Sequence, residues 1–152
     1  MRKESNSADD FSYEIENDGV TITGYKGKRI NVVIPNEIDG LPVVAIGDYA
    51  FYENELTNVV IPDSVETIGY AAFADNQLTN VVIPDSVKTI ENSAFRDNEL
   101  TDVVIPDSVK TIGEFAFAFN QLTNVVIPNS VETIAKLAFD DDVEIIRKDN
   151  LN

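Results

Sequence analysis

The sequence predicts an α/β repeat solenoid, a stack of short coils that share a parallel β-sheet and are connected by short helical turns. Four prolines, at positions 62, 84, 106 and 128, lie 22 residues apart, and the apolar residues around them repeat with the same period. A unit of this length cannot enclose a core alone, so it must bury its apolar face against its neighbours. We expect about five coils, the last four of which begin at Leu56, Leu78, Leu100 and Leu122.

One repeat unit, residues 78–99, shows why each part of the coil is expected. Val81 and Ile83 lie two residues apart and point to the same side of an extended segment, which predicts a short strand that ends at Pro84. A second extended segment follows at residues 87–90. The stretch around Phe95 is too short for more than about two helical turns, and we expect Asn98 to end it in a left-handed conformation.

The two ends of the chain depart from the repeat. Residues 1–10 are polar, and we expect a mobile tail outside the fold. Residues 11–29 alternate around Asn17-Asp18-Gly19, which predicts a β-hairpin that caps the first coil. The repeats then run from 30 to 142, with five extra residues near 37–42 that we expect to form a loop. Residues 143–152 are predicted to add a last strand and a polar tail.

The composition excludes several functional classes. The 152 residues carry a formal charge of −16, which disfavours binding to nucleic acid or to anionic membranes. Histidine and cysteine are both absent, so the usual nucleophile pairs of hydrolases and the usual zinc ligands are missing. We therefore expect no enzyme, no cofactor, no metal site and no membrane insertion, and we interpret residues 140–142, three adjacent aspartates, as a solvated loop. Residues 1–10 do not resemble a signal peptide.

A longer motif carries a family resemblance. The pattern Ile-Pro-x-Ser-Val-x-x-Ile-Gly-x-x-Ala-Phe-x-x-Asn occurs at residues 61–76 and again at 105–120. It resembles the BspA-like class of leucine-rich repeat, although Glu91 and Ala135 stand where the family usually has glycine. The resemblance implies a right-handed leucine-rich-repeat stack without catalytic residues. It also implies an extracellular or cell-surface location in bacteria or some protists, where such domains engage components of a host or a neighbouring cell.

The predicted strand places one column of valines and one column of amides or acids outside the core. These residues are our candidate partner-binding face: Asn58, Val60, Asn80, Val82, Asp102, Val104, Asn124 and Val126. A stripe of exposed valines indicates a binding surface. The alternative is that valine is present only because it favours strands.

Two aromatic residues break the repeat. Phe115 and Phe119 stand where neighbouring coils have small or charged residues, and a helical turn would bring them together. Phe119 is a candidate contact with a partner or a second copy, in a monomer or weak dimer, and the alternative is local packing. Phe115 is equally explained as core.

Taken together, these features favour a scaffold that binds a protein partner on a host or neighbouring cell, with adhesion or recognition at the cell surface as its role. The alternative is a structural spacer module of a longer cell-wall protein that has no ligand of its own.

Overall fold

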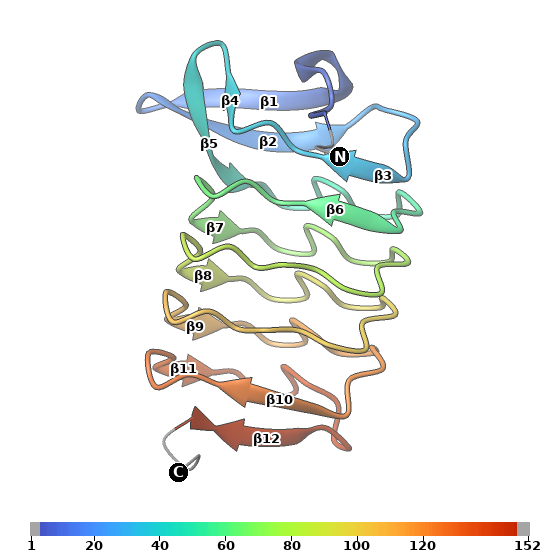
Figure 1. Cartoon of the computed structure of the whole chain (residues 1–152), viewed down its shortest axis with the longest axis vertical. Coiled ribbons are helices and arrows are strands. Elements are labelled where there is room, and N and C mark those ends of the chain that lie inside the picture. The colour runs from blue at the N-terminus through green and yellow to red at the C-terminus, as the bar shows by residue number, and fades with distance from the viewer. Residues whose placement is uncertain (1–3, 149–152) are drawn as a thin grey trace.

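A computed structural model describes residues 4–148, which form one stack of coils with the N-terminal cap at one end and the last strand at the other (Figure 1). The predicted parallel solenoid is confirmed. The strands are β1 Phe11–Glu16, β2 Gly19–Tyr25, β3 Asn31–Val33, β4 Glu37–Ile38, β5 Leu41–Ile46, β6 Asn58–Val60, β7 Thr67–Ile68, β8 Thr89–Ile90, β9 Thr111–Ile112, β10 Asn124–Ile127, β11 Thr133–Ile134 and β12 Glu144–Arg147.

The continuous sheet runs through the second extended segment of each coil. Its order is β1-β2-β5-β7-β8-β9-β11, and every pair from β2 onward is parallel. The segment predicted as the main strand pairs less completely: β3 pairs with β6, β10 pairs with β12, and a single bridge joins Val82 to Val104 between them. The short Thr-Ile strands therefore hold the coils in register.

The N-terminal cap is the predicted hairpin. Asn17 and Asp18 both have positive φ, 50° and 60°, as a two-residue hairpin turn requires. The expected loop at 37–42 is wrong: β4 and β5 form a second hairpin, with positive φ at Asp39 and Gly40. The expected tail also contributes to the fold, since the buried Asn6 exchanges two hydrogen bonds of 2.9 Å with the backbone of Val33. Residues 1–3 and 149–152 lie outside the described residues.

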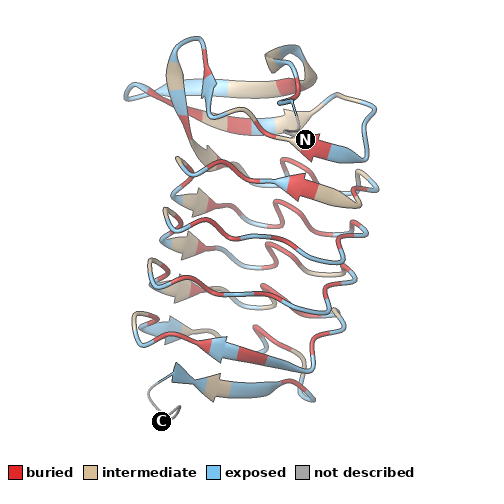
Figure 2. Ribbon diagram, in the orientation of Figure 1, coloured by how far each residue is buried: buried red, intermediate tan, exposed pale blue. Residues whose placement is uncertain are grey.

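A column of phenylalanines occupies the centre of the stack. Neighbouring rings lie parallel to within 9° with centroids 5.1–5.4 Å apart, in the series Phe51, Phe73, Phe95, Phe117 and Phe139. Figure 2 shows buried residues recurring along each coil, one layer after another. Each coil therefore completes the interior of the next, as the 22-residue period predicts.

The short helical turns are absent from residues 4–148, where the one helix is the 3-10 helix η1 Ala8–Asp10. The stretch around each buried phenylalanine instead forms tight turns that bond to the next coil. The Phe73 N–H, for example, donates to the Ala94 carbonyl at 2.8 Å. The turns around Phe51, Phe73, Phe95 and Phe117 each contain two left-handed residues four positions apart, such as Ser93 with φ 60° and Asp97 with φ 57°. Such φ values interrupt a right-handed helix.

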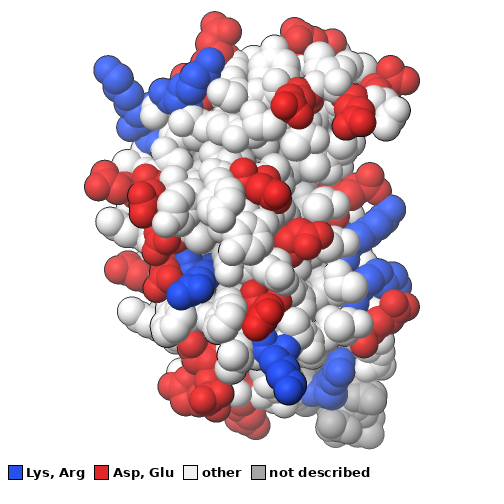
Figure 3. Space-filling view, turned by 180° about the vertical axis from the view of Figure 1, so that it is seen from behind, with Lys and Arg blue, Asp and Glu red and all other residues white. Residues whose placement is uncertain are grey.

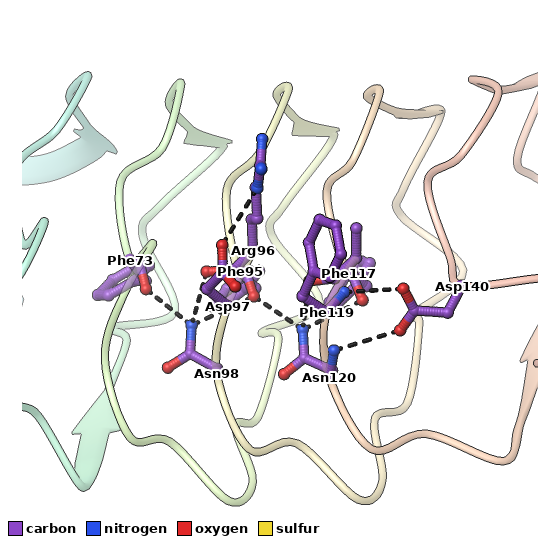
Figure 4. Close-up of polar contacts among 10 residues, drawn as sticks. Phe73, Phe95, Arg96, Asp97, Asn98, Phe117, Phe119, Asn120 and Asp140 are labelled. Carbon is purple, nitrogen blue, oxygen red and sulfur yellow. Dashed lines mark hydrogen bonds and ion pairs between the residues drawn. The ribbon is translucent and has the colours of Figure 1, made fainter.

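The asparagines at the ends of these turns do not adopt the expected left-handed conformation. The left-handed residue is the preceding one, and the asparagine side chain binds backbone instead. The Asn98 amide nitrogen donates to the carbonyls of Phe73 and Phe95 at 2.9 and 3.2 Å (Figure 4). Its amide oxygen accepts from the Leu78 N–H at 3.0 Å. Asn76 and Asn120 repeat this arrangement. Asn76, Asn98 and Asn120 therefore form an asparagine ladder that links neighbouring coils, in which Asn76 and Asn98 are buried and Asn120 is half-buried.

The irregular use of glycine follows from a second contact between coils. Asn92 accepts a hydrogen bond from the Glu114 N–H at 2.8 Å, and a Cβ at Gly113 would lie 2.4 Å from the Asn92 nitrogen. Asp48 makes the equivalent bond to the coil that contains Gly69. Glu91 and Ala135 occupy the glycine position in two other coils. In the coils that precede them, Tyr70 and Glu114 stand at the position of Asn92, and their side chains make no such hydrogen bond to the next coil. Glycine is therefore needed for close approach, and not for positive φ.

Candidate binding surfaces of the solenoid

The predicted valine column is exposed. Val82 and Val104 have 79% and 74% of their surface accessible, and Val60 and Val126 have 44% and 37%. The strand registers extend this column by Val33, which pairs with Val60, and by Ile146, which pairs with Val126. We call these six residues the valine stripe. Val33 is the last residue of the same Asn-Val-Val motif and could be identified from the sequence, whereas Ile146 lies beyond the repeats.

The neighbouring column of amides and acids is also at the surface. Asn80, Asp102 and Asn124 are exposed, and Asn58 is half-buried. Asp102 and Asn124 line a hollow of about 220 Å³ together with Val104 and Val126. Lys148 lies at its edge and contacts Asp107 at 3.3 Å. The structure therefore brings the predicted valine and polar columns together on one face.

Phe115 and Phe119 lie on a different face, formed by the turns. Phe119 is exposed and Phe115 is half-buried, with left-handed φ values of 57° and 60°. Their rings flank the Arg96 guanidinium, whose carbon lies 5.3 Å from the Phe115 centroid and 5.0 Å from that of Phe119. This is a cation–π arrangement, and Arg96 also pairs with Asp97 at 3.1 Å.

The core alternative for Phe115 is not supported, because Phe115 itself is only half-buried and the buried members of its column are the small residues Ala71 and Ser93. Tyr49 and Leu137, which share that column, each expose about half of their surface. Next to this site, the Asp140 carboxylate accepts hydrogen bonds from the N–H groups of Phe119 and Asn120, at 2.9 and 3.2 Å (Figure 4). Asp140 therefore closes the asparagine ladder and is more than a solvated loop residue.

Three tyrosines form a second aromatic group on the turn face, which sequence reasoning missed. The Tyr49 ring lies 5.5 Å from that of Tyr52 and 5.3 Å from that of Tyr70, in edge-to-face geometry. We call these three residues the tyrosine cluster. The Glu53 carboxylate, as hydrogen-bond partner of the Tyr52 hydroxyl, raises the pKa of Tyr52 to about 12. Loss of hydration, then the hydrogen bond with Tyr70, raises the pKa of Tyr49.

Charged side chains are spread over the outside of the stack. Figure 3 shows acidic side chains along the length of one side, with fewer basic ones between them. Lys88 and Glu66 pair at 2.7 Å. They lie at the same position of two adjacent coils, and both side chains remain well exposed. Among residues 4–148 no cluster of acids has the number of ligands a metal site needs. Over the same range no helix has the length and apolarity to cross a bilayer.

The chain is similar to several solved bacterial proteins. A leucine-rich repeat protein of T. pallidum shares 38% identity, over 93% of this chain and 69% of the other, with a TM-score of 0.84. One from Bacteroides ovatus shares 26% identity over 95% of this chain and 41% of the other, with a TM-score of 0.74. One from Bacteroides capillosus shares 25% identity over 94% and 99%, with a TM-score of 0.54.

No curated protein matches the chain. The model of the BspA type leucine rich repeat region matches six copies over residues 43–148, which is more than half of the chain. The asparagine ladder, the phenylalanine column and the 22-residue register all lie largely within this range. The fold of such repeats is generally non-enzymatic, and domains built from them often mediate protein interactions. The chain therefore belongs to the BspA type leucine rich repeat family.

Proposed function

We propose that this protein is a binding scaffold that engages a protein partner through the valine stripe. The observation that carries the proposal is the exposure of Val82 and Val104, at 79% and 74%. Burying one valine side chain is worth about 1.5–3 kcal/mol, so a partner that covers several members of the stripe gains considerable affinity. The polar column beside it supplies hydrogen-bonding groups at the edge of such an interface.

Strand propensity is a weak account of these two valines. Strand propensity explains the presence of valine where a segment pairs continuously with its neighbours in a sheet. Val82 and Val104 instead belong to segments joined by a single bridge, while the continuous ladder runs through the Thr-Ile strands elsewhere in the coil. The two most exposed valines thus lie in segments that contribute least to the continuous sheet, which favours a role in binding.

The proposed setting is the bacterial cell surface, with adhesion or recognition of a host or neighbouring cell as the role. Family membership supports this setting, because BspA type repeats are typical of surface-associated bacterial proteins. The charge of −16 keeps the stack soluble and repels anionic membranes. The alternative function is a spacer, which the regularity of the coils and the greater length of the T. pallidum and Bacteroides ovatus proteins favour.

The test is a double substitution, Val82→Lys with Val104→Lys, assayed against a panel of purified matrix and cell-surface proteins. Because both side chains already face water, we expect the free energy of unfolding to change by less than about 1 kcal/mol. We expect binding of the wild-type partner to be lost. The matched control is Gln77→Lys with Gln121→Lys, which adds the same charge at exposed positions outside the stripe and should retain binding.

The outcomes separate the two functions. Unfolding of the valine variant would show that these residues belong to the core. Equal binding by the valine variant and the wild type would overturn the stripe as the contact surface. If the wild type binds no member of the panel, the spacer function is favoured.

A further inference from the structure

The tyrosine cluster holds three of the five tyrosines of the chain on one exposed patch. It borders a hollow of about 280 Å³ that is also lined by Ala71 and Ala74. The hollow is shaped by residues of three successive coils, so it exists only in the assembled stack. No residue of the valine stripe lines it, and it is a separate surface.

The fold does not require aromatic residues at these positions. One coil further along, Ala74 replaces Tyr52 and Asn92 replaces Tyr70, with the same backbone path. Tyr49 has a φ of 59°, which is unfavourable for a bulky side chain, and the small residues Ala71 and Ser93 occupy the same position in the next two coils. Exposed rings at positions where the repeat accepts alanine, asparagine or serine indicate a surface selected for contact.

The surroundings of the cluster are acidic. Asp75 and Asp97 line the hollow, and Asp48 and Glu53 adjoin the rings in the chain. Of residues 4–148, the one cation that lines it is Arg96, which pairs with Asp97 and lies over the rings of Phe115 and Phe119. Aromatic faces beside uncompensated carboxylates attract positive charge through both the ring quadrupole and the Coulomb interaction.

We propose that the tyrosine cluster, with Asp75, binds an arginine side chain presented by a basic segment of a partner protein. The same face already contains an arginine bound in this way, because the Arg96 guanidinium lies between two aromatic rings and its Nε pairs with a carboxylate. A guanidinium suits the cluster better than an ammonium, since it is planar, stacks on rings and pairs with a carboxylate through two N–H groups. This surface is additional to the valine stripe and does not depend on it.

The hydroxyl groups fit this role. The Tyr52 hydroxyl has the Glu53 carboxylate as its hydrogen-bond partner, and this contact raises the pKa of Tyr52 to about 12. Its carboxylate partner Glu53 adds to the negative potential at the edge of the cluster. The bound arginine therefore meets both aromatic rings and carboxylates at this surface.

The experiment is calorimetric titration of the full chain at low salt with an acetylated Gly-Arg-Gly-Arg-Gly amide peptide. Two peptides of the same length serve as comparisons, one with citrulline and one with lysine in place of arginine. Citrulline keeps the shape of arginine and removes its charge. We expect the arginine peptide to bind at least tenfold more tightly than the citrulline peptide, and more tightly than the lysine peptide.

The variant is Tyr49→Leu, Tyr52→Ala and Tyr70→Asn together, each residue being one that a sister coil carries at the same position. The fold should be retained, which circular dichroism checks, and affinity for the arginine peptide should fall at least tenfold. Asp75→Asn should also weaken it. The control is Val82→Thr with Val104→Thr, which alters the valine stripe without changing charge and should leave the arginine peptide bound.

Three results would overturn the proposal. Unchanged affinity in the triple variant would assign binding to the diffuse negative charge of the stack. Equal affinity for citrulline would show that charge is irrelevant, and equal affinity for lysine would remove the assignment to a guanidinium. Loss of binding in the threonine control would place the peptide on the valine stripe instead.

Discussion

Residue types recur at equivalent positions more strictly in the interior columns of the stack than on the turn face. Inside the stack, one residue type recurs in every coil, as the phenylalanine column shows. On the turn face, the column that begins at Tyr49 continues as Ala71, Ser93, Phe115 and Leu137. An interior residue must match the layer above and the layer below, whereas a residue of this turn-face column must tolerate a left-handed backbone conformation, and only its small members Ala71 and Ser93 are buried. Departures from the repeat on this face are therefore where specific contacts are to be sought.

The largest effect is expected from an interior ring. Phe95→Ala removes a side chain that is fully buried and stacked on both sides, and it should lower the free energy of unfolding by about 3–5 kcal/mol in denaturant titration. Phe139→Ala is the comparison, because Phe139 stacks on Phe117 alone among the described residues and is slightly exposed. Equal losses in the two variants would show that stacking between layers adds little.

A somewhat smaller effect is expected from the asparagine ladder. Asn98→Ala leaves the Leu78 N–H and two buried carbonyls without their partner, and at about 1 kcal/mol for each unsatisfied group we expect a loss of about 3 kcal/mol. Asn80→Ala, on the exposed polar column, should change stability by less than about 0.5 kcal/mol. Similar values for both would remove the ladder as a source of stability.

The smallest effect on stability is expected on the turn face. Phe119→Asp gives this coil the residue that two earlier coils carry, at Asp75 and Asp97, and costs only the exposed contact with Arg96, about 0.5–1 kcal/mol. If Phe119 is a self-contact, sedimentation velocity should show weak association of the wild type that the variant loses. Phe119→Leu keeps an apolar surface and is the control. Identical sedimentation of wild type and variant would restrict Phe119 to local packing.

The sequence predicted the features that depend on periodicity. The stack, the cap hairpin, the last strand and the exposure of the valines all follow from apolar spacing and from the residues of one turn. The 22-residue period could not distinguish a helical turn from the tight turns around Phe95, because both fit the same number of residues. It also could not show which of two extended segments would pair continuously.

Contacts that join distant residues escaped prediction. The role of Asn98 depends on carbonyls in two coils, and its type alone suggested a local turn. The tyrosine cluster combines Tyr49 and Tyr52 of one coil with Tyr70 of the next, at different positions of the repeat. Comparison along a column shows each tyrosine separately, and only the geometry of the turns shows that the three rings lie together.

The Thr-Ile strands pair in identical register from Thr67 to Thr133. One unit can thus be exchanged for, or inserted beside, another without a new type of joint. A chain lengthened by a copy of residues 78–99 would keep the same interior contacts between coils. The added coil would increase the distance between the two ends of the stack, so the length of the stack can change without a change in how its coils pack.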